Sequence, residues 1–526
     1  MHPPEAAVNQ YQSAAASPPP HDSARRTTGL TLLLLMAAGT VVRFLYLTRK
    51  PFWFDESFSV EVARISWSNF LHLLWWREAN MSLYYVLLRI WLQFGHSEFY
   101  IRSLSVVIAV ATIPAIYWLA RLLYDGRVAL VAAALFAFNA YSVRYAQEAR
   151  SYALFLLLAT LSSAFLIAFI REPVRRNRVG YVLVSILAVY AHFYALLLLA
   201  AHWLTMRWLG SDEGCTERSG AKLSAQLRRV WITIGVAVLP LLVFVAKTGA
   251  GPIRWIQRPG FRDLFEFFEH LAGANGWPLL ALCSVACVVA VWPLGKSLWT
   301  RGQAWEVWRC QFLLLWLVFP VLLTVLLSFA RPVFLSRYMI FCLPALLILV
   351  AAGLARLRQS WLLTVALTGI LLLCMQGVLF VYGNDFDTER DASGAAAGFI
   401  LDHAQPGDAV VFHIAATRIP YEFVRSLRSG QNTASAMFTA QLGPEILFPD
   451  HGAGLDYGDF TGKPTADFLR AAMQSHPRVW VMLMNNGPAE SPDATTVMLT
   501  KLLPEAFPKM KSWHFAKVEV RLYSEK

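Results

Sequence analysis

The chain of 526 residues is 57% hydrophobic and only 15% charged, with a mean hydropathy of +0.47. This apolar fraction is too large for a soluble core. Apolar runs of about twenty residues recur between residues 29 and 382, matching the roughly 30 Å hydrocarbon thickness of a bilayer. The net charge of +12 therefore indicates basic cytoplasmic loops and not a nucleic-acid surface. Composition predicts an α-helical polytopic membrane protein.

The N-terminal residues 1–28 are rich in Pro, Ala and Ser, which predicts a disordered cytoplasmic tail. Arg25 and Arg26 precede the first apolar run, and Arg49-Lys50-Pro51 follows it where a cleaved signal peptide would have small residues. The first run is therefore expected to remain as a membrane anchor.

Eleven crossings are predicted in the membrane domain, residues 29–382, at 29–47, 101–121, 128–144, 152–170, 180–196, 197–209, 230–247, 277–295, 309–330, 335–355 and 360–382. With the N-terminus inside, the short basic loops all fall in the cytoplasm, as the inside-positive bias requires. The stretch 180–209 is tight for two crossings. It is expected to form two short helices meeting near His192, with one long tilted helix as the alternative.

The first outer loop, residues 48–100, contains an apolar run, Ser82 to Phe94, that is too short to cross and is expected to lie along or dip into the membrane. After residue 383 the apolar runs shorten to strand length, at 409–412, 479–484 and 518–523, with a helix near 421–427. Residues 383–526 are therefore predicted to form a small extracytoplasmic α/β domain. The sequence contains no GxGxxG or GxxxxGK[ST] loop, which argues against an ATP-driven pump or a nucleotide-sugar enzyme.

Two adjacent carboxylates, Asp55 and Glu56, stand just after the first crossing in the stretch Pro51 to Ser59. Acids at this depth are costly unless they are used, although an interfacial aromatic belt with two solvated acids is the simpler alternative. Glu61 and Glu78 add further carboxylates to the same loop.

Cations also gather on the predicted outer face, against the inside-positive bias, so they require an anionic ligand or a paired acid. A phosphate attached to a lipid would supply one. The outer-face polar residues are Arg144, Gln147, Glu148 and Arg150, His192 and Tyr194, Arg254 and Arg258, and Arg331, Arg337 and Tyr338.

Five separated motifs in residues 30–355 resemble the bacterial GT-C glycosyltransferases, in particular the protein O-mannosyltransferase-like group that includes the aminoarabinose transferases of lipid A. They are Phe52-Trp53-Phe54-Asp55-Glu56, Leu83 to Trp91 with Tyr84, Glu98 to Ser105, Tyr145 to Leu154, and Ser336-Arg337-Tyr338. The chain departs from the family at Asn80-Met81-Ser82, where His-Pro-Pro or Lys-Pro-Pro is frequent, which bears on contacts with the acceptor.

The resemblance implies transfer of a sugar from a polyprenyl-phosphate donor to an acceptor lipid, glycan or protein outside the cytoplasm, at the bacterial inner membrane. Asp55 aligns with the family's catalytic acid and would act as general base, with inversion at the sugar carbon. Glu56 is the second candidate catalytic acid. Residues expected to contact substrates are Glu78, Tyr84, Gln147, Glu148, Arg150, His192, Tyr194, Arg254, Arg258, Arg337 and Tyr338.

Each candidate also has a structural interpretation. Asp55 could cap a helix beginning near Ser57, and Glu78 could form an exposed pair with Arg77. Gln147, Glu148 and Arg150 could form a network that ties helix ends together, and His192 could be a neutral ring bonded to a carbonyl. Arg254 and Arg258 could contact lipid headgroups, and Arg337 could be an ordinary interface anchor.

No cofactor is assigned. Asp55, Glu56 and His192 have residue types that suit a divalent metal, but their spacing carries no metal signature, and the six cysteines form no CxxC or Cys/His cluster. A lipid-linked sugar flippase or secondary transporter is the main alternative function, with the acids coupled to protons. A non-catalytic assembly protein on the same fold is the third.

Overall fold

The computed structural model describes residues 22–76, 78–209, 217–248, 256–273, 276–297, 304–384, 390–429, 443–448, 462–473, 475–484 and 493–525. The chain divides into two compact units. The first contains the residues up to Leu45 together with Ser105–Asn384, and the second contains Tyr46–Leu104 together with Asp385–Lys526.

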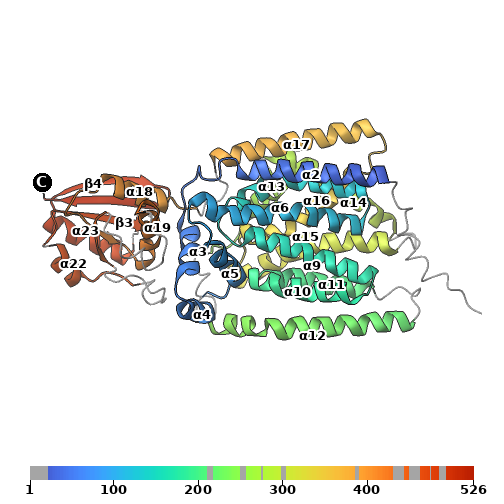
Figure 1. Ribbon diagram of the computed structural model, residues 1–526, viewed down its shortest axis with the longest axis horizontal. Helices are drawn as coiled ribbons and strands as arrows, with labels where there is room; N and C mark the ends of the chain where they lie inside the picture. The colour runs from blue at the N-terminus through green and yellow to red at the C-terminus, as the bar shows by residue number, and fades with distance from the viewer. Residues whose placement is uncertain are drawn as a thin grey trace, which may run out of the picture. The chain divides into compact units, whose positions relative to one another are not determined.

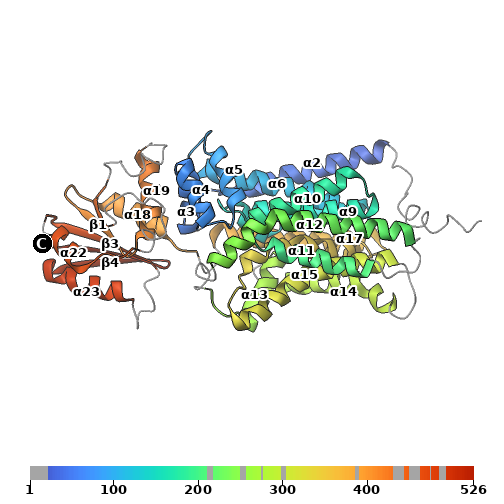
Figure 2. The same cartoon turned by 90° about the horizontal axis from the view of Figure 1, so that it is seen from below.

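The first unit is a helical bundle whose helices run alongside one another (Figures 1 and 2). Its elements are α2 (Asp22–Phe44), α6 (Glu98–Leu123, which continues from the second unit), α7 (Gly126–Phe138), α8 (Ala140–Ala146), α9 (Tyr152–Arg171), α10 (Arg175–Ala191), α11 (Ala195–Leu209), α12 (Glu217–Thr248), α13 (Phe261–Ala272), α14 (Trp277–Ser297), α15 (Ala304–Ala330), η2 (Ser336–Cys342), α16 (Leu343–Leu354) and α17 (Ser360–Gly383).

Within the described residues, seven helical segments are long and apolar enough to cross a membrane, and two bent pairs, α7 with α8 and α13 with α14, raise the number to nine. The two remaining predicted crossings are the helices α10 and α11, with 17 and 15 residues. Seventeen residues of helix rise only roughly 26 Å, short of a full crossing. The predicted polytopic helical fold is thus confirmed, as are two short helices meeting at His192.

Burial separates the centre of the bundle from its surface. In the apolar segment Ser336–Leu354, which comprises η2 and α16, 94% of the residues compared are buried, against 22% in α17 and 17% in Arg26–Phe44 of α2. Exposed apolar side chains such as Leu33 and Leu372, at 63% and 66% exposure, suit a hydrocarbon environment. At the centre, α16 approaches α14 closely at Gly353, where a Cβ would lie 1.9 Å from the carbonyl oxygen of Ala286.

The start of α2 differs from the sequence prediction. Residues 22–28, expected to belong to the disordered tail, form the first turns of this helix, because a helix can extend beyond its apolar run into polar residues. Residues 1–21 of the predicted tail lie outside the described residues.

The second unit combines the first outer loop with the C-terminal region. The loop forms α3 (Phe54–Arg64), α4 (Trp67–Trp76) and α5 (Ser82–Trp91). The C-terminal elements are α18 (Ser393–His403), β1 (Ala409–Phe412), η3 (Ala415–Thr417), α19 (Arg418–Ser429), β2 (Glu445–Phe448), α22 (Ala466–Met473), β3 (Arg478–Met484), α23 (Ala494–Ala506), β4 (Lys509–Phe515) and β5 (Val518–Ser524).

The five strands form one mixed sheet in the order β2-β1-β3-β5-β4. Strand β1 pairs in parallel with β2 and β3, whereas β5 pairs antiparallel with β3 and β4. The three strands predicted from the sequence are β1, β3 and β5, and the predicted helix lies within α19.

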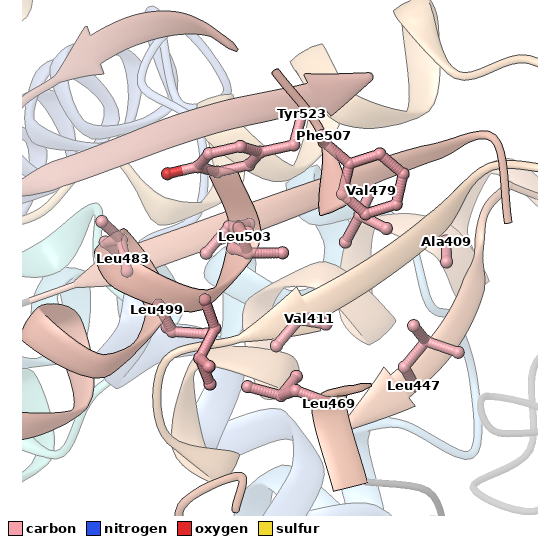
Figure 3. Packing of buried hydrophobic residues seen from close by; sticks show 12 residues of the cluster. Ala409, Val411, Leu447, Leu469, Val479, Leu483, Leu499, Leu503, Phe507 and Tyr523 are labelled. Carbon is pink, nitrogen blue, oxygen red and sulfur yellow. The ribbon is translucent and has the colours of Figure 1, made fainter. Parts of the chain in front are cut away.

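Side chains alternate between the two faces along each strand, and apolar residues lie on both faces of this sheet. Helices cover both faces (Figure 2). On one face Val411, Val479 and Leu483 pack with Leu499 and Leu503 of α23 (Figure 3). On the other face, α18 and α19 pack against the alternate positions, which include Val410, Trp480 and Val520.

The first outer loop packs on this α/β domain. Phe52 stacks on Phe423 of α19 with ring centroids 4.6 Å apart, and Phe54 packs against the cluster between the sheet, α18 and α19. Residues 48–100, assigned from the sequence to the membrane domain, therefore belong to one compact unit with the C-terminal domain. The short run expected at 82–94 forms α5, which has ten residues and buries Tyr84, Tyr85 and Leu88.

Candidate active site

The acidic motif occupies the first turn of α3. Trp53 is the N-cap residue, with an extended backbone and no side-chain cap, so the helix begins at Phe54. Asp55 therefore lies inside the first turn, and the interpretation of Asp55 as the cap of a helix starting near Ser57 does not hold. Its side chain is half-buried, and carboxylates are favourable at a helix N-terminus.

Arg102 donates to both carboxylate oxygens of the neighbouring Glu56. The guanidinium donates from Nε to Oε1 and from an Nη to Oε2, both at 2.7 Å, and both side chains are buried. Arg102 also donates to the carbonyls of Leu47 and Lys50, each at 2.8 Å. This bidentate pair fixes the entry to α3. The geometry favours a positioning role for Glu56, and the catalytic role of Asp55 stays a prediction.

A second set of predicted residues meets in the first unit, around His192. This ring is buried at the turn between α10 and α11 and stacks on Phe155 with centroids 5.0 Å apart. Tyr338 packs edge-on against it at 4.7 Å. The hydroxyl of Tyr194 donates to the carbonyl of Val333, which ties this turn to the segment before η2.

Two buried arginines lie near the tyrosine rings that neighbour this imidazole. Arg150 and Arg337 are 6% and 4% exposed, and both act electrostatically on His192. Arg150 lies near the ring of Tyr152, and Arg337 lies near that of Tyr338. We call Arg150, His192, Arg337 and Tyr338 the basic cluster. The structure thus brings together residues that the sequence placed on three separate outer turns.

The proton of His192 can be placed from its hydrogen bond. Nδ1 accepts the backbone N–H of Tyr194 at 3.2 Å, so a neutral ring carries its proton on Nε2. In the described part of the chain, this buried Nε2 has no hydrogen-bond partner. A buried donor of this kind requires an acceptor, and an anionic ligand would provide one.

Other predicted site residues have structural contacts. Glu148 is buried and pairs with Arg144 at 3.0 Å, in line with a network that ties helix ends together. Gln147 donates to the carbonyls of Arg43 and Leu45, at 3.0 and 2.7 Å, and so links α8 to the end of α2.

The remaining candidates are not members of the basic cluster. Glu78 accepts a long hydrogen bond from Tyr85, at 3.4 Å, and Tyr84 is buried in α5. Arg258 is exposed. Arg254, and Arg77 as the suggested partner of Glu78, lie outside the described residues. Contacts of these residues with substrate stay predictions.

Both oxygens of Glu56, one of the three residues whose types suit a divalent metal, accept hydrogen bonds from Arg102. Among the described residues, no group of three His, Cys, Asp or Glu side chains is placed to hold a metal ion.

Solved structures match this arrangement along nearly the whole chain. The apo crystal structure of ArnT from Cupriavidus metallidurans superposes with a TM-score of 0.59 at 13% identity, covering 95% of this chain and 99% of that one. The chain has the fold of ArnT. The same protein bound to undecaprenyl phosphate gives a TM-score of 0.55 at 14% identity, with 93% and 97% covered.

The Archaeoglobus fulgidus oligosaccharyltransferase, in complex with Zn and sulfate, matches with a TM-score of 0.52 at 10% identity, covering 86% of this chain and 67% of that one. No protein-family profile and no curated protein sequence matches the chain. The predicted resemblance to the aminoarabinose transferases is therefore confirmed for the fold. The ArnT match extends over both the membrane helices and the α/β domain, since it covers 95% of this chain.

Proposed function

We propose that the protein is an integral-membrane glycosyltransferase that moves a sugar from a polyprenyl-phosphate donor to an acceptor hydroxyl on a lipid, glycan or protein. The observation that carries this proposal is the basic cluster in a chain with the ArnT fold: it holds two buried guanidinium groups and an imidazole N–H that has no hydrogen-bond partner among the described residues. ArnT itself has been crystallised with undecaprenyl phosphate, the lipid phosphate that such a transfer would release.

The chemistry follows from the charge that develops during transfer. The bond from the sugar carbon to the phosphate oxygen breaks, and the polyprenyl phosphate leaves with an additional negative charge. Arg150, Arg337 and the Nε2–H of His192 would stabilise that charge in a site of low dielectric constant. Donors fixed before reaction are worth more there than in water, because they do not need to reorganise.

Asp55 would accept the proton of the acceptor hydroxyl as the new bond to the sugar carbon forms, with inversion at that carbon. The bidentate pair of Glu56 with Arg102 holds the turn that carries Asp55. Asp55 lies in the second unit, and its role as general base is part of the proposal. We place the reaction on the extracytoplasmic face of the bacterial inner membrane, with the α/β domain on that side.

Purified protein in lipid nanodiscs, given radiolabelled polyprenyl-phosphate sugars and a panel of acceptors, tests the proposal. We expect label to appear on an acceptor together with an equal amount of free polyprenyl phosphate. In sealed vesicles, donor that changes leaflet without any release of polyprenyl phosphate would favour the flippase instead and overturn the enzyme assignment.

A further inference from the structure

The chain returns to the acidic motif directly after its last membrane helix. Arg390 donates to the carbonyl of Pro51 at 2.8 Å, a contact between residues 339 positions apart. The same guanidinium lies 3.6 Å from Oε2 of Glu56. Glu56 therefore interacts with two cations, Arg102 from the start of α6 and Arg390 from the start of the C-terminal domain.

Asp391 supplies the cap that α3 lacks. The N-cap residue Trp53 has no side chain that can accept from the first turn, and a helix leaves its first backbone N–H groups without partners. Oδ1 of Asp391 accepts the N–H of Phe54 at 3.3 Å, and also that of Ser393 at 2.9 Å. A distant carboxylate thus binds the amide immediately before Asp55.

A backbone contact brings the two segments together still more closely. The N–H of Gly394 donates to the carbonyl of Phe52 at 3.2 Å. A Cβ at position 394 would lie 2.2 Å from that carbonyl oxygen, which is backbone and cannot rotate away. Only glycine permits this approach.

The contacts converge on Asp55. Residues on both sides of it, Phe54 and Glu56, are held by Asp391 and Arg390, and the carboxylates of Asp55 and Asp391 interact electrostatically. Burial raises the pKa of Asp391, and the nearby Asp55 adds to this effect. A displacement of about 1 Å in a reacting group can lower a rate on the order of 100-fold.

We propose that Asp391 is a positioning residue for Asp55, and that the segment Arg390–Gly394 makes the C-terminal domain part of the active site. This inference rests on the proposed transferase function. It assigns to the C-terminal domain a role in the reaction itself, in addition to any binding of an acceptor or partner protein.

The test compares Asp391→Ala with Asp391→Asn in the full-length protein. The amide oxygen of Asn can still accept the N–H of Phe54, whereas Ala cannot. We expect Asp391→Ala to lower kcat about 10- to 100-fold while KM for the lipid donor stays within about twofold, and Asp391→Asn to restore most of kcat. Asp402→Ala is the matched control, since Asp402 lies on α18 and pairs with Arg428 near the surface.

Gly394→Ala provides an independent variant, because its Cβ displaces the same segment without changing a charge. It should reproduce the loss of kcat caused by Asp391→Ala. Wild-type kcat in both variants, or equal losses in Asp391→Ala and Asp391→Asn, would overturn the positioning role.

Hydrogen exchange separates this inference from the transferase proposal. Amides of residues 54–57 should exchange at least tenfold faster in Asp391→Ala than in wild type or in Asp391→Asn. This result is expected whichever reaction the protein catalyses. Unchanged exchange in Asp391→Ala would refute the cap even if the protein proves to be a transferase.

Discussion

The acidic motif and the basic cluster are stabilised in different ways. Around the motif, buried charges are paired, as Glu56 is with Arg102 and Arg390. In the basic cluster, Arg150, Arg337 and His192 lie among the rings of Phe155, Tyr152 and Tyr338. Paired charges hold structure, whereas a buried imidazole N–H without a hydrogen-bond partner in the described part of the chain is suited to an anionic ligand.

Removing one partner of the Glu56–Arg102 pair should cause the largest loss of stability around the acidic motif. Arg102→Ala leaves a buried carboxylate with less compensation, so we expect the second unit to lose about 3–5 kcal/mol of stability. Chemical denaturation monitored by hydrogen exchange in residues 46–104 measures this loss. Arg102→Lys, which keeps the charge but not the bidentate geometry, should lose less; equal stability of Ala and wild type would contradict the role of the pair.

Titration of Glu61 should make the stability of the second unit depend on pH. Burial raises the pKa of Glu61 to about 7 from 4.5, with Glu422 adding to the shift and Arg64 and Arg418 opposing it. The folded state therefore holds a proton that the unfolded state releases, so the contribution of Glu61 to stability is fully present below pH 4.5 and is lost as pH rises to 7. The full loss corresponds to roughly 3 kcal/mol.

Glu61→Gln should remove this pH dependence and stabilise the second unit at pH 8. Denaturation midpoints of wild type and variant between pH 5 and pH 8 provide the measurement. Parallel curves for the two proteins would show that Glu61 does not titrate in this range.

Truncation in the basic cluster should affect ligand binding more than folding. We expect Arg150→Ala and Arg337→Ala each to weaken polyprenyl phosphate binding about 10- to 100-fold, because charged hydrogen bonds contribute about 1.5–3 kcal/mol. Binding to protein in nanodiscs can be measured by calorimetry or by native mass spectrometry. Arg127→Ala, at an exposed position on α7, serves as the comparison; wild-type affinity in both cluster variants would remove the proposed phosphate site.

The smallest effect is expected at an exposed ion pair. Arg428 and Asp402 are 2.7 Å apart with side chains 35% and 60% exposed. Solvent screens such pairs, so Arg428→Ala should change stability by less than about 1 kcal/mol. A loss as large as that of Arg102→Ala would mean that burial does not distinguish the two kinds of pair.

Apolar periodicity predicted the helices well because a bilayer requires long apolar segments. The buried strands β1, β3 and β5 were also predicted, whereas β2 and β4 were not. Strands β2 and β4 lie at the two edges of the sheet, and β4 carries exposed polar residues such as Lys509 and Lys511, so its pattern lacks the apolar signal of a central strand.

The site was predicted in part. The sequence placed Arg150, His192 and Arg337 on one membrane face through the alternation of crossings, and the structure brings them together. The roles of Arg102 and Asp391 were missed. Arg102 had a signal, an arginine at the start of an apolar helix that needs an acid. Asp391 had none, because its contact with Phe54 joins residues 337 positions apart.

The central claim is that Asp55, and not its neighbour Glu56, takes the acceptor's proton. Transfer rate and polyprenyl phosphate binding measured together for Asp55→Asn test it most directly. We expect kcat to fall at least 100-fold while affinity for the lipid phosphate stays at the wild-type value, since a general base typically contributes 10²–10⁴-fold. Transfer at the wild-type rate in Asp55→Asn would contradict the account.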